Sequence, residues 1–190
     1  MAVSLPSRSE LVNDMITAAT IEQVRSLVGE VCDPELPPVT LADLGILRSV
    51  EAQDDTIVVT LTPTYSGCPA VEFIEDEVRR TVHAAGHDSV RIERAFSPPW
   101  STEWITAEGR RKLSEAGIAP PRREADIAPA PVAGSGPVAV VLGRTNKPPV
   151  PCPRCGSTNT GEVSRFGSTA CKSLHRCHAC SEPFDHFKEI

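Results

Sequence analysis

Two Cys-x-x-Cys pairs close to the C-terminal end constrain this chain more than any other feature. They are Cys152-Pro153-Arg154-Cys155 and Cys177-His178-Ala179-Cys180, with 21 residues between them. Two thiolates spaced by two residues can bind one metal ion from a tight turn, and two such turns complete a tetrahedral site of four sulfurs. The pattern therefore predicts a structural zinc site formed by Cys152, Cys155, Cys177 and Cys180 in a β-rich ribbon.

Three neighbouring residues are alternative ligands for that metal, namely Cys171, His175 and His178. Histidine is a good zinc ligand, so a mixed site is an alternative to the four-cysteine site. Gly156 supports the first turn, whereas the second pair has no glycine in the same place. If the four paired cysteines bind the zinc, Cys171 is left as a buried thiol or as a ligand of another metal.

The seven cysteines indicate a reducing compartment, because four of them have metal-ligand spacing rather than the pattern of a disulfide framework. The N-terminal sequence has no apolar signal-peptide core, and no apolar run approaches ~18 residues. We therefore expect a cytoplasmic protein that does not span a membrane.

The charge argues against nucleic acid as a partner. The whole chain has a net charge of −6, and residues 152–190 contain five basic and four acidic residues. A ribbon that bound phosphates would show a clearer basic excess.

The first part of the chain predicts a compact α+β domain. Its apolar periodicity indicates elements in the order α-β-β-α-β-α around a three-stranded core sheet. The expected elements are a helix over Ile21–Val31, strands over Ile46–Glu51 and Thr56–Thr62, a helix from Cys68-Pro69 to about Ala85, a strand over Val90–Phe96 and a helix over Trp104–Ala116.

The domain boundaries follow from changes in composition. We expect an N-terminal arm over 1–17, the α+β domain over 18–117, a linker rich in proline and alanine over 118–148, and the zinc ribbon over 149–190. The one apolar run of the linker, 138–142, is expected to form an edge strand on the ribbon.

Cys68 is the second candidate site residue. It lies between Gly67 and Pro69, and proline is favoured at the first position of a helix. The thiol is therefore expected at a helix N-terminus, where free amides and the helix dipole favour a thiolate with a low pKa. Such a sulfur can bind a soft metal or attack an electrophile. The alternative is a small residue that merely fits a tight turn.

Asp33-Pro34-Glu35 is the third candidate. The two carboxylates can accept hydrogen bonds from backbone amides or lie near Cys68, although spacing alone favours a plain turn with solvated acids. Cys32 adds a thiol to the same loop, and a small side chain at a helix end is its simpler interpretation.

These motifs together resemble a known family. With Asp33-Pro34-Glu35, Asp43-Leu44-Gly45-Ile46 and Thr64-Tyr65-Ser66-Gly67-Cys68-Pro69 in this order, residues 18–116 resemble the SufT-like domains associated with maturation of iron–sulfur proteins. The resemblance implies that Cys68 is the reactive cysteine of the family and that Asp33, Pro34 and Glu35 form its acidic-proline motif.

The remaining motifs narrow the resemblance to the PaaD (PaaJ) family of bacterial phenylacetate-degradation proteins. They are 98–105, 109–113, 117–121, 152–157, 166–172 and 182–188. This family implies a place beside phenylacetyl-CoA epoxidase, a multicomponent oxygenase with a di-iron centre and a reductase carrying flavin and an iron–sulfur cluster. The chain itself has neither the Glu-x-x-His pairs of a di-iron site nor a nucleotide-binding glycine fingerprint, so we expect it not to be an enzyme.

The expected function is therefore that of an accessory maturation protein. Cys68 would transiently hold an iron–sulfur cluster or iron, in one chain or across a homodimer, and the ribbon would dock the epoxidase subunits or their iron–sulfur reductase. A permanently bound structural or regulatory subunit is the main alternative. A thiol-redox enzyme is a weaker one, because Cys68 has no adjacent resolving cysteine.

Overall fold

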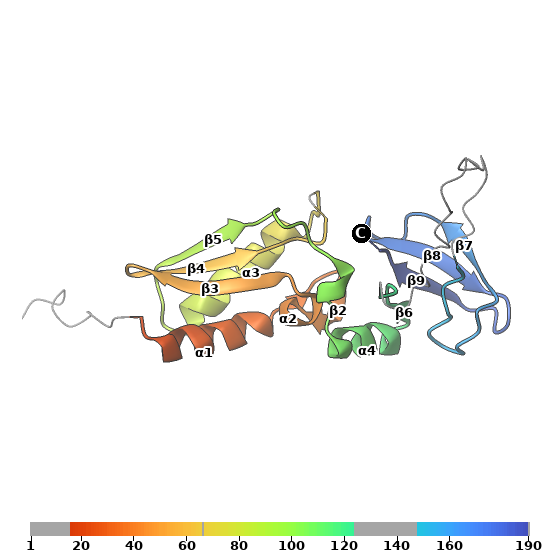
Figure 1. Cartoon of the computed structure of the whole chain (residues 1–190), viewed down its shortest axis with the longest axis horizontal. Coiled ribbons are helices and arrows are strands. Elements are labelled where there is room, and N and C mark those ends of the chain that lie inside the picture. Colours follow the sequence, from red (N-terminus) through yellow and green to blue (C-terminus); the bar gives the residue numbers. More distant parts are fainter. Residues whose placement is uncertain (1–15, 66, 124–147, 190) are drawn as a thin grey trace, which may run out of the picture.

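The computed structural model describes residues 16–65, 67–123 and 148–189, which form an α+β domain followed by a β-rich ribbon (Figure 1). The first domain contains α1 (Ala18–Gly29), β1 (Cys32–Asp33), β2 (Leu36–Thr40), α2 (Leu41–Leu44), β3 (Leu47–Gln53), β4 (Thr56–Leu61), α3 (Val71–Ala84), β5 (Val90–Arg94), a 3-10 turn (Thr102–Trp104) and α4 (Ala107–Glu115). The ribbon contains β7 (Thr160–Ser164), β8 (Lys172–Cys177) and β9 (Pro183–Phe187), and β6 (Ile118–Ala119) joins it.

The core sheet has three strands, as the apolar pattern predicted, and their order is β3-β4-β5. β3 and β4 form an antiparallel hairpin, and β5 returns parallel to β4 after the crossover through α3. The two long helices pack on one face of this sheet, because α1 and α3 bury their apolar stripes in the same core as alternate residues of β4. This packing fixes the end of α3 that lies nearest to Cys68.

A small hairpin and a short helix between α1 and β3 were not predicted. β1 and β2 pair through a turn at Pro34-Glu35, with Asp33 opposite Leu36. A two-residue strand has no measurable apolar period, and the two prolines of β2 argued against a strand, although proline is tolerated where a ladder has a free edge. The hairpin places the acidic loop in a defined position instead of leaving it as a solvated turn.

The predicted helix over 104–116 was wrong at its start. Thr106 is the N-cap of α4 and accepts a hydrogen bond from the Gly109 amide at 2.9 Å, so the helix begins at Ala107. The preceding Thr102–Trp104 segment forms a separate 3-10 turn. The first helix likewise starts and ends earlier than predicted, at Ala18 and Gly29.

The ribbon sheet has the order β6-β9-β8-β7. β6 directly follows Gly117 and pairs in parallel with β9, so 118–119, the first two residues of the predicted linker, belong to this sheet. The linker boundary at 118 was therefore placed too early. The predicted edge strand over 138–142 lies outside the described residues.

The ribbon packs against one end of the first domain. The fully buried ring of Phe187 meets Trp100 edge-on with 5.9 Å between ring centroids. The Trp100 indole nitrogen donates to the Leu44 carbonyl at 2.9 Å, and the buried Arg110 guanidinium donates to the Thr102 and Pro121 carbonyls. These contacts fix the position of the ribbon relative to the loops of the first domain. Within the part of the chain that the structure describes, no helix has the length and apolarity needed to cross a bilayer.

Candidate metal-binding sites

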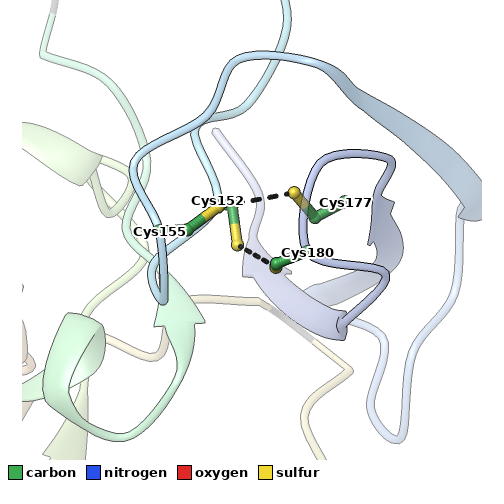
Figure 2. Close-up of side chains that lie close together, drawn as sticks. All are labelled: Cys152, Cys155, Cys177 and Cys180. Carbon is green, nitrogen blue, oxygen red and sulfur yellow. Dashed lines mark hydrogen bonds between the residues drawn. The ribbon is translucent and has the colours of Figure 1, made fainter.

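The four paired cysteines converge in the ribbon, as predicted (Figure 2). Their sulfurs all lie within 4.8 Å of one another, with 3.8 Å between Cys152 and Cys180 and 3.6 Å between Cys155 and Cys177. A tetrahedral zinc ion with bonds of about 2.3 Å to sulfur needs sulfur–sulfur distances of about 3.8 Å. The donor set and its spacing therefore fit one tetrahedral zinc ion.

The two turns that carry these cysteines have the same form. Gly156 follows the first pair with φ +73°, and Ser181 follows the second pair with φ +64°. Ser181 thus adopts the same left-handed backbone conformation as Gly156. The sequence indicated this conformation only for the first turn, which contains the glycine. Hydrogen bonds from the backbone amides of Cys180 and Ala179 hold the pKa of Cys177 at about 7, below its ordinary value, which favours the thiolate that zinc requires.

Neither histidine considered as an alternative ligand belongs to this group of four. His175 is buried, its ring stacks on Phe184, and its Nε2 lies 3.0 Å from the Ser173 hydroxyl. Burial lowers the pKa of His175, so its ring stays neutral inside the ribbon. His178 is exposed. The mixed cysteine–histidine alternative is therefore not supported.

Cys68 lies two residues before the N-cap of α3, which is Ala70, so the expectation that Pro69 opens the helix was wrong. The thiol is half-buried and packs against the apolar core. Burial raises the pKa of Cys68, the amide of Ala70 opposes that shift, and the carboxylates of Glu35 and Asp33 raise the pKa further. The predicted lowering of this pKa was therefore wrong in direction, because desolvation and acidic neighbours outweigh the helix N-terminus.

The acidic loop lies beside Cys68, as one of the two interpretations of the sequence suggested. Asp33 is 7% exposed and its Oδ1 accepts hydrogen bonds from the amides of Glu35 at 2.7 Å and Leu36 at 3.2 Å. Burial raises the pKa of Asp33 although these amides oppose the shift. Asp33 therefore sets the shape of the turn, and that turn points the carboxylate of Glu35 towards the ribbon. Cys32, on the neighbouring position of β1, is exposed rather than buried.

Cys171 reaches the same place from the ribbon. It immediately precedes β8, is 8% exposed, and its thiol donates to a Glu35 carboxylate oxygen at 3.9 Å. The Thr169 hydroxyl oxygen lies 3.0 Å from the same sulfur. The fold thus brings together two thiols and two carboxylates from loops far apart in the chain: Cys68, Cys171, Asp33 and Glu35.

Three cavities lie near these residues, and one of them, of about 480 Å³, is lined by Cys32 and Asp33 on the side of α1 and α3. A small one of about 10 Å³ is lined by Asp33, Cys68 and apolar side chains, and it has room for about one water-sized particle. A larger one of about 550 Å³ is lined mainly by ribbon residues, including His175 and His186, and by no cysteine. No thiol therefore borders this hollow, although Ala170, the residue before Cys171, does.

Comparisons with known proteins find a matching family for each half of the chain. The family profile of the PaaD zinc beta ribbon domain matches residues 137–188, and the profile of iron–sulfur cluster assembly proteins matches residues 21–93. A protein of Escherichia coli (strain K12), provisionally described as a component of 1,2-phenylacetyl-CoA epoxidase, is 38% identical over 175 residues, which cover 92% of this chain and 96% of that protein. The chain belongs to the PaaD family.

Shorter relatives match the first domain of this PaaD-family chain. An Fe-S protein maturation auxiliary factor of Porphyromonas gingivalis (strain ATCC BAA-308 / W83) is 34% identical over 96 residues, covering 50% of this chain and 90% of that protein. A solved DUF59 domain from Bacillus anthracis is 27% identical, covers 53% of this chain and 97% of that one, and superimposes with a TM-score of 0.48.

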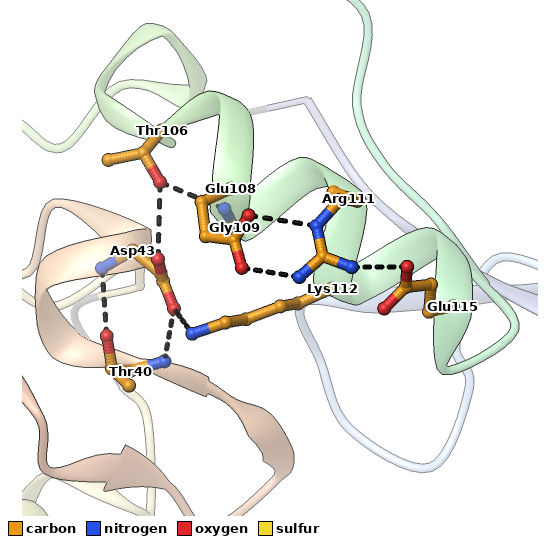
Figure 3. Close-up of polar contacts among 8 residues, drawn as sticks. All are labelled: Thr40, Asp43, Thr106, Glu108, Gly109, Arg111, Lys112 and Glu115. Carbon is orange, nitrogen blue, oxygen red and sulfur yellow. Dashed lines mark hydrogen bonds and ion pairs between the residues drawn. The ribbon is translucent and has the colours of Figure 1, made fainter.

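The Asp43-Leu44-Gly45-Ile46 motif of the PaaD-family chain has a structural role (Figure 3). Asp43 forms a reciprocal capping box with Thr40 and an ion pair with Lys112 at 2.6 Å. Burial alone would raise the pKa of Asp43, but the hydrogen bonds from Lys112 and Thr40 together outweigh it, so this pKa is lowered. Asp43 therefore fastens α2 to α4 and takes no part in the thiol group.

Sequence reasoning missed the partnership of Cys171 with Glu35 in this PaaD-family chain. The two residues are 136 positions apart, so no local spacing connects them. The signal that the sequence did contain was indirect: a cysteine left over beside a complete four-cysteine zinc site.

Proposed function

We propose that this chain is a non-catalytic accessory protein that matures phenylacetyl-CoA epoxidase, and that it delivers iron or an iron–sulfur cluster through Cys68. The observation that carries the proposal is a half-buried thiol beside the acidic loop, in the domain that matches the iron–sulfur assembly profile. The Escherichia coli relative, described as part of the epoxidase, supports the choice of client. The partners are the epoxidase subunits or their iron–sulfur reductase, and the compartment is the cytoplasm.

The electrostatics around Cys68 suit a site that releases its cargo. Because burial and nearby carboxylates raise the pKa of Cys68, the empty site holds a neutral thiol. A metal cation displaces that proton and is attracted by the same carboxylates. A site with few ligands of this kind exchanges its metal more readily than a closed cage of four sulfurs.

The ribbon has a different task. When bound, zinc supplies a crosslink between the two turns that carry the paired cysteines, and the remaining ribbon residues present a folded surface to the client. The ribbon residues described in the structure have no strong positive charge, which favours a protein client over a nucleic acid.

The test of this function is replacement of Cys68 by alanine in a bacterial host that needs the protein for growth on phenylacetate. We expect Cys68→Ala to abolish activation of the epoxidase, and growth on phenylacetate with it, because the cargo ligand is lost. The purified variant should keep one zinc per chain and its unfolding transition. Cys32→Ala, which removes an exposed thiol of the neighbouring strand, is the matched control and should grow normally.

Normal growth of the Cys68→Ala strain would contradict the delivery function. Stoichiometric co-purification of the chain with the epoxidase core, independent of Cys68, would instead support a permanently bound structural or regulatory subunit.

A further inference from the structure

We propose that Cys171 is the second thiolate ligand of the cargo site, so that one ferrous ion is held between Cys68 of the first domain and Cys171 of the ribbon, with the Glu35 carboxylate as a further ligand. This inference rests on the proposed function and names the ligands of the same site. It also assigns a task to the one ribbon cysteine that the zinc site does not use.

The position of Cys171 is the first argument. Its sulfur lies 3.9 Å from a Glu35 carboxylate oxygen, and it is part of the buried cluster against which Cys68 packs. The backbone amide of Lys188 donates to the Cys171 carbonyl at 2.9 Å, so β9 also holds this residue. The Cys171 thiol and the Glu35 carboxylate, from loops far apart in the chain, thus meet at the contact between the domains, and Cys68 lies near enough for both to contribute to the rise in its pKa.

The charges around these thiols are the second argument. Cys171 and Cys68 both lie within the influence of the Glu35 and Asp33 carboxylates, which disfavours two bare thiolates there. The next residue, Lys172, is also buried, but its ammonium pairs with Asp185 at 3.4 Å. A buried group of acids and thiols is stabilised once a cation arrives, and thiolate with carboxylate is a donor set that accepts ferrous iron.

The exposure of the group indicates how an ion would enter. Cys171 is 8% exposed and Asp33 is 7% exposed, whereas Cys68 is half-buried, so access is from the Cys68 side. Cys68 and Asp33 also line a cavity of about 10 Å³, of which Cys171 and Glu35 are not lining residues.

Strand β8 connects this site to the zinc. It runs from Lys172, next to Cys171, to Cys177, which is one of the four zinc ligands. Its six residues span roughly 20 Å. The ribbon therefore holds Cys171 in place against the first domain, and the second thiol comes from the same chain and not from a second copy.

The experiment uses the full-length, zinc-loaded protein without oxygen, with Co²⁺ as a coloured probe for Fe²⁺. Each thiolate bound to Co²⁺ adds intensity to the sulfur-to-cobalt charge-transfer absorption. We expect Cys68→Ala and Cys171→Ala each to remove about half of that intensity and to weaken Co²⁺ binding by roughly tenfold or more. Glu35→Gln should weaken binding while leaving the intensity per bound ion unchanged. Cys32→Ala is the control and should match the wild type.

Zinc content and the unfolding transition, measured on the same samples, show whether Cys171→Ala is folded. Cys171→Ser, which keeps a side chain of similar size, gives a second variant at this position. If both Cys171 variants bind Co²⁺ with wild-type affinity and intensity while Cys68→Ala does not, Cys171 is not a ligand and the delivery function still stands. If Cys68→Ala also behaves as the wild type, the cargo site itself is refuted.

Discussion

Two aspartates of this chain show how the surroundings of a residue decide its role. Asp43 and Asp33 both lie in short acidic motifs and both are 7% exposed. Asp43 has Lys112 and two hydrogen bonds to Thr40, and its pKa is lowered. Asp33 accepts hydrogen bonds from two backbone amides, but the effect of its burial outweighs theirs, and its pKa is raised. Asp43 therefore stabilises the fold as an anion, whereas Asp33 lies in the proposed cargo site, which a cation would stabilise.

At this scale we predict that Asp43→Asn lowers the free energy of unfolding by about 1–2 kcal/mol at neutral pH, because it breaks the ion pair with Lys112 and weakens the capping box. A lowered pKa means that the ionised form stabilises the folded state. This contribution is complete at neutral pH and is lost as the pH falls below about 4 and through the folded-state pKa. Urea denaturation of both proteins from neutral to acidic pH measures the difference.

The matched control is Asp76→Asn, which removes an exposed ion pair with Arg79. Exposed pairs contribute little, so this change should cost less than about 0.5 kcal/mol at any pH. A gap between wild type and Asp43→Asn that stays constant into the acid range would contradict the structural role given to Asp43.

At the scale of elements, α2 is a part of the first domain that was not predicted from the sequence. This helix has four residues, too few to show a period, and it ends at Gly45 with φ +67°. A side chain on Gly45 would place its Cβ 2.6 Å from the Cβ of Trp104 and 2.8 Å from the Trp104 carbonyl oxygen. The end of α2 therefore depends on a glycine both for its backbone conformation and for the close approach of the 3-10 turn.

Gly45→Ala is predicted to destabilise the protein by about 2 kcal/mol or more, of which roughly 1 kcal/mol is backbone strain and the rest is the clash with Trp104. Gly86→Ala is the control, since Gly86 also has positive φ but nothing lies within 4 Å of the added Cβ. It should cost only about 1 kcal/mol. Equal losses at the two positions, measured by urea denaturation, would show that the packing of Trp104 on Gly45 is unimportant.

The elements that were predicted correctly are those with long apolar periods. The apolar stripe of α3 predicted the helix, and the β-branched run of β4 predicted the strand. The β1–β2 hairpin depends instead on hydrogen bonds that Asp33 accepts from two backbone amides of its own turn. Likewise, the left-handed backbone conformation of Ser181 in the second cysteine turn was not predicted. Such local hydrogen bonds and backbone conformations leave no periodic signal in a sequence.

On the scale of the whole molecule, the zinc site and the proposed cargo site lie at opposite ends of strand β8. The zinc ligands were predicted because two local spacings identified all four of them. The contact between Cys171 and Glu35 was not predicted, because it arises only when the ribbon docks through Phe187 on Trp100. A site formed by two domains cannot be read from the spacing within either one.

Removal of zinc should therefore expose Cys171. A structural zinc contributes roughly 10 kcal/mol or more to the fold of a small ribbon, so a strong chelator should unfold this one and release β8. We expect alkylation of Cys171, measured by mass spectrometry of its peptide, to accelerate by at least tenfold after chelation. Cys32 is exposed in either state and should react at the same rate, which makes it the internal control. Protection of Cys171 that persists without zinc would contradict this coupling.

The parallel pairing of β6 with β9 has a practical consequence for cutting the chain into fragments. A fragment that starts after Ala119 would leave one side of β9 with unpaired amides and carbonyls. Open strand edges attract other chains and promote aggregation. Expression of the C-terminal half by itself should therefore begin upstream of Ile118, and poor solubility of shorter versions would say nothing about whether this half binds its client.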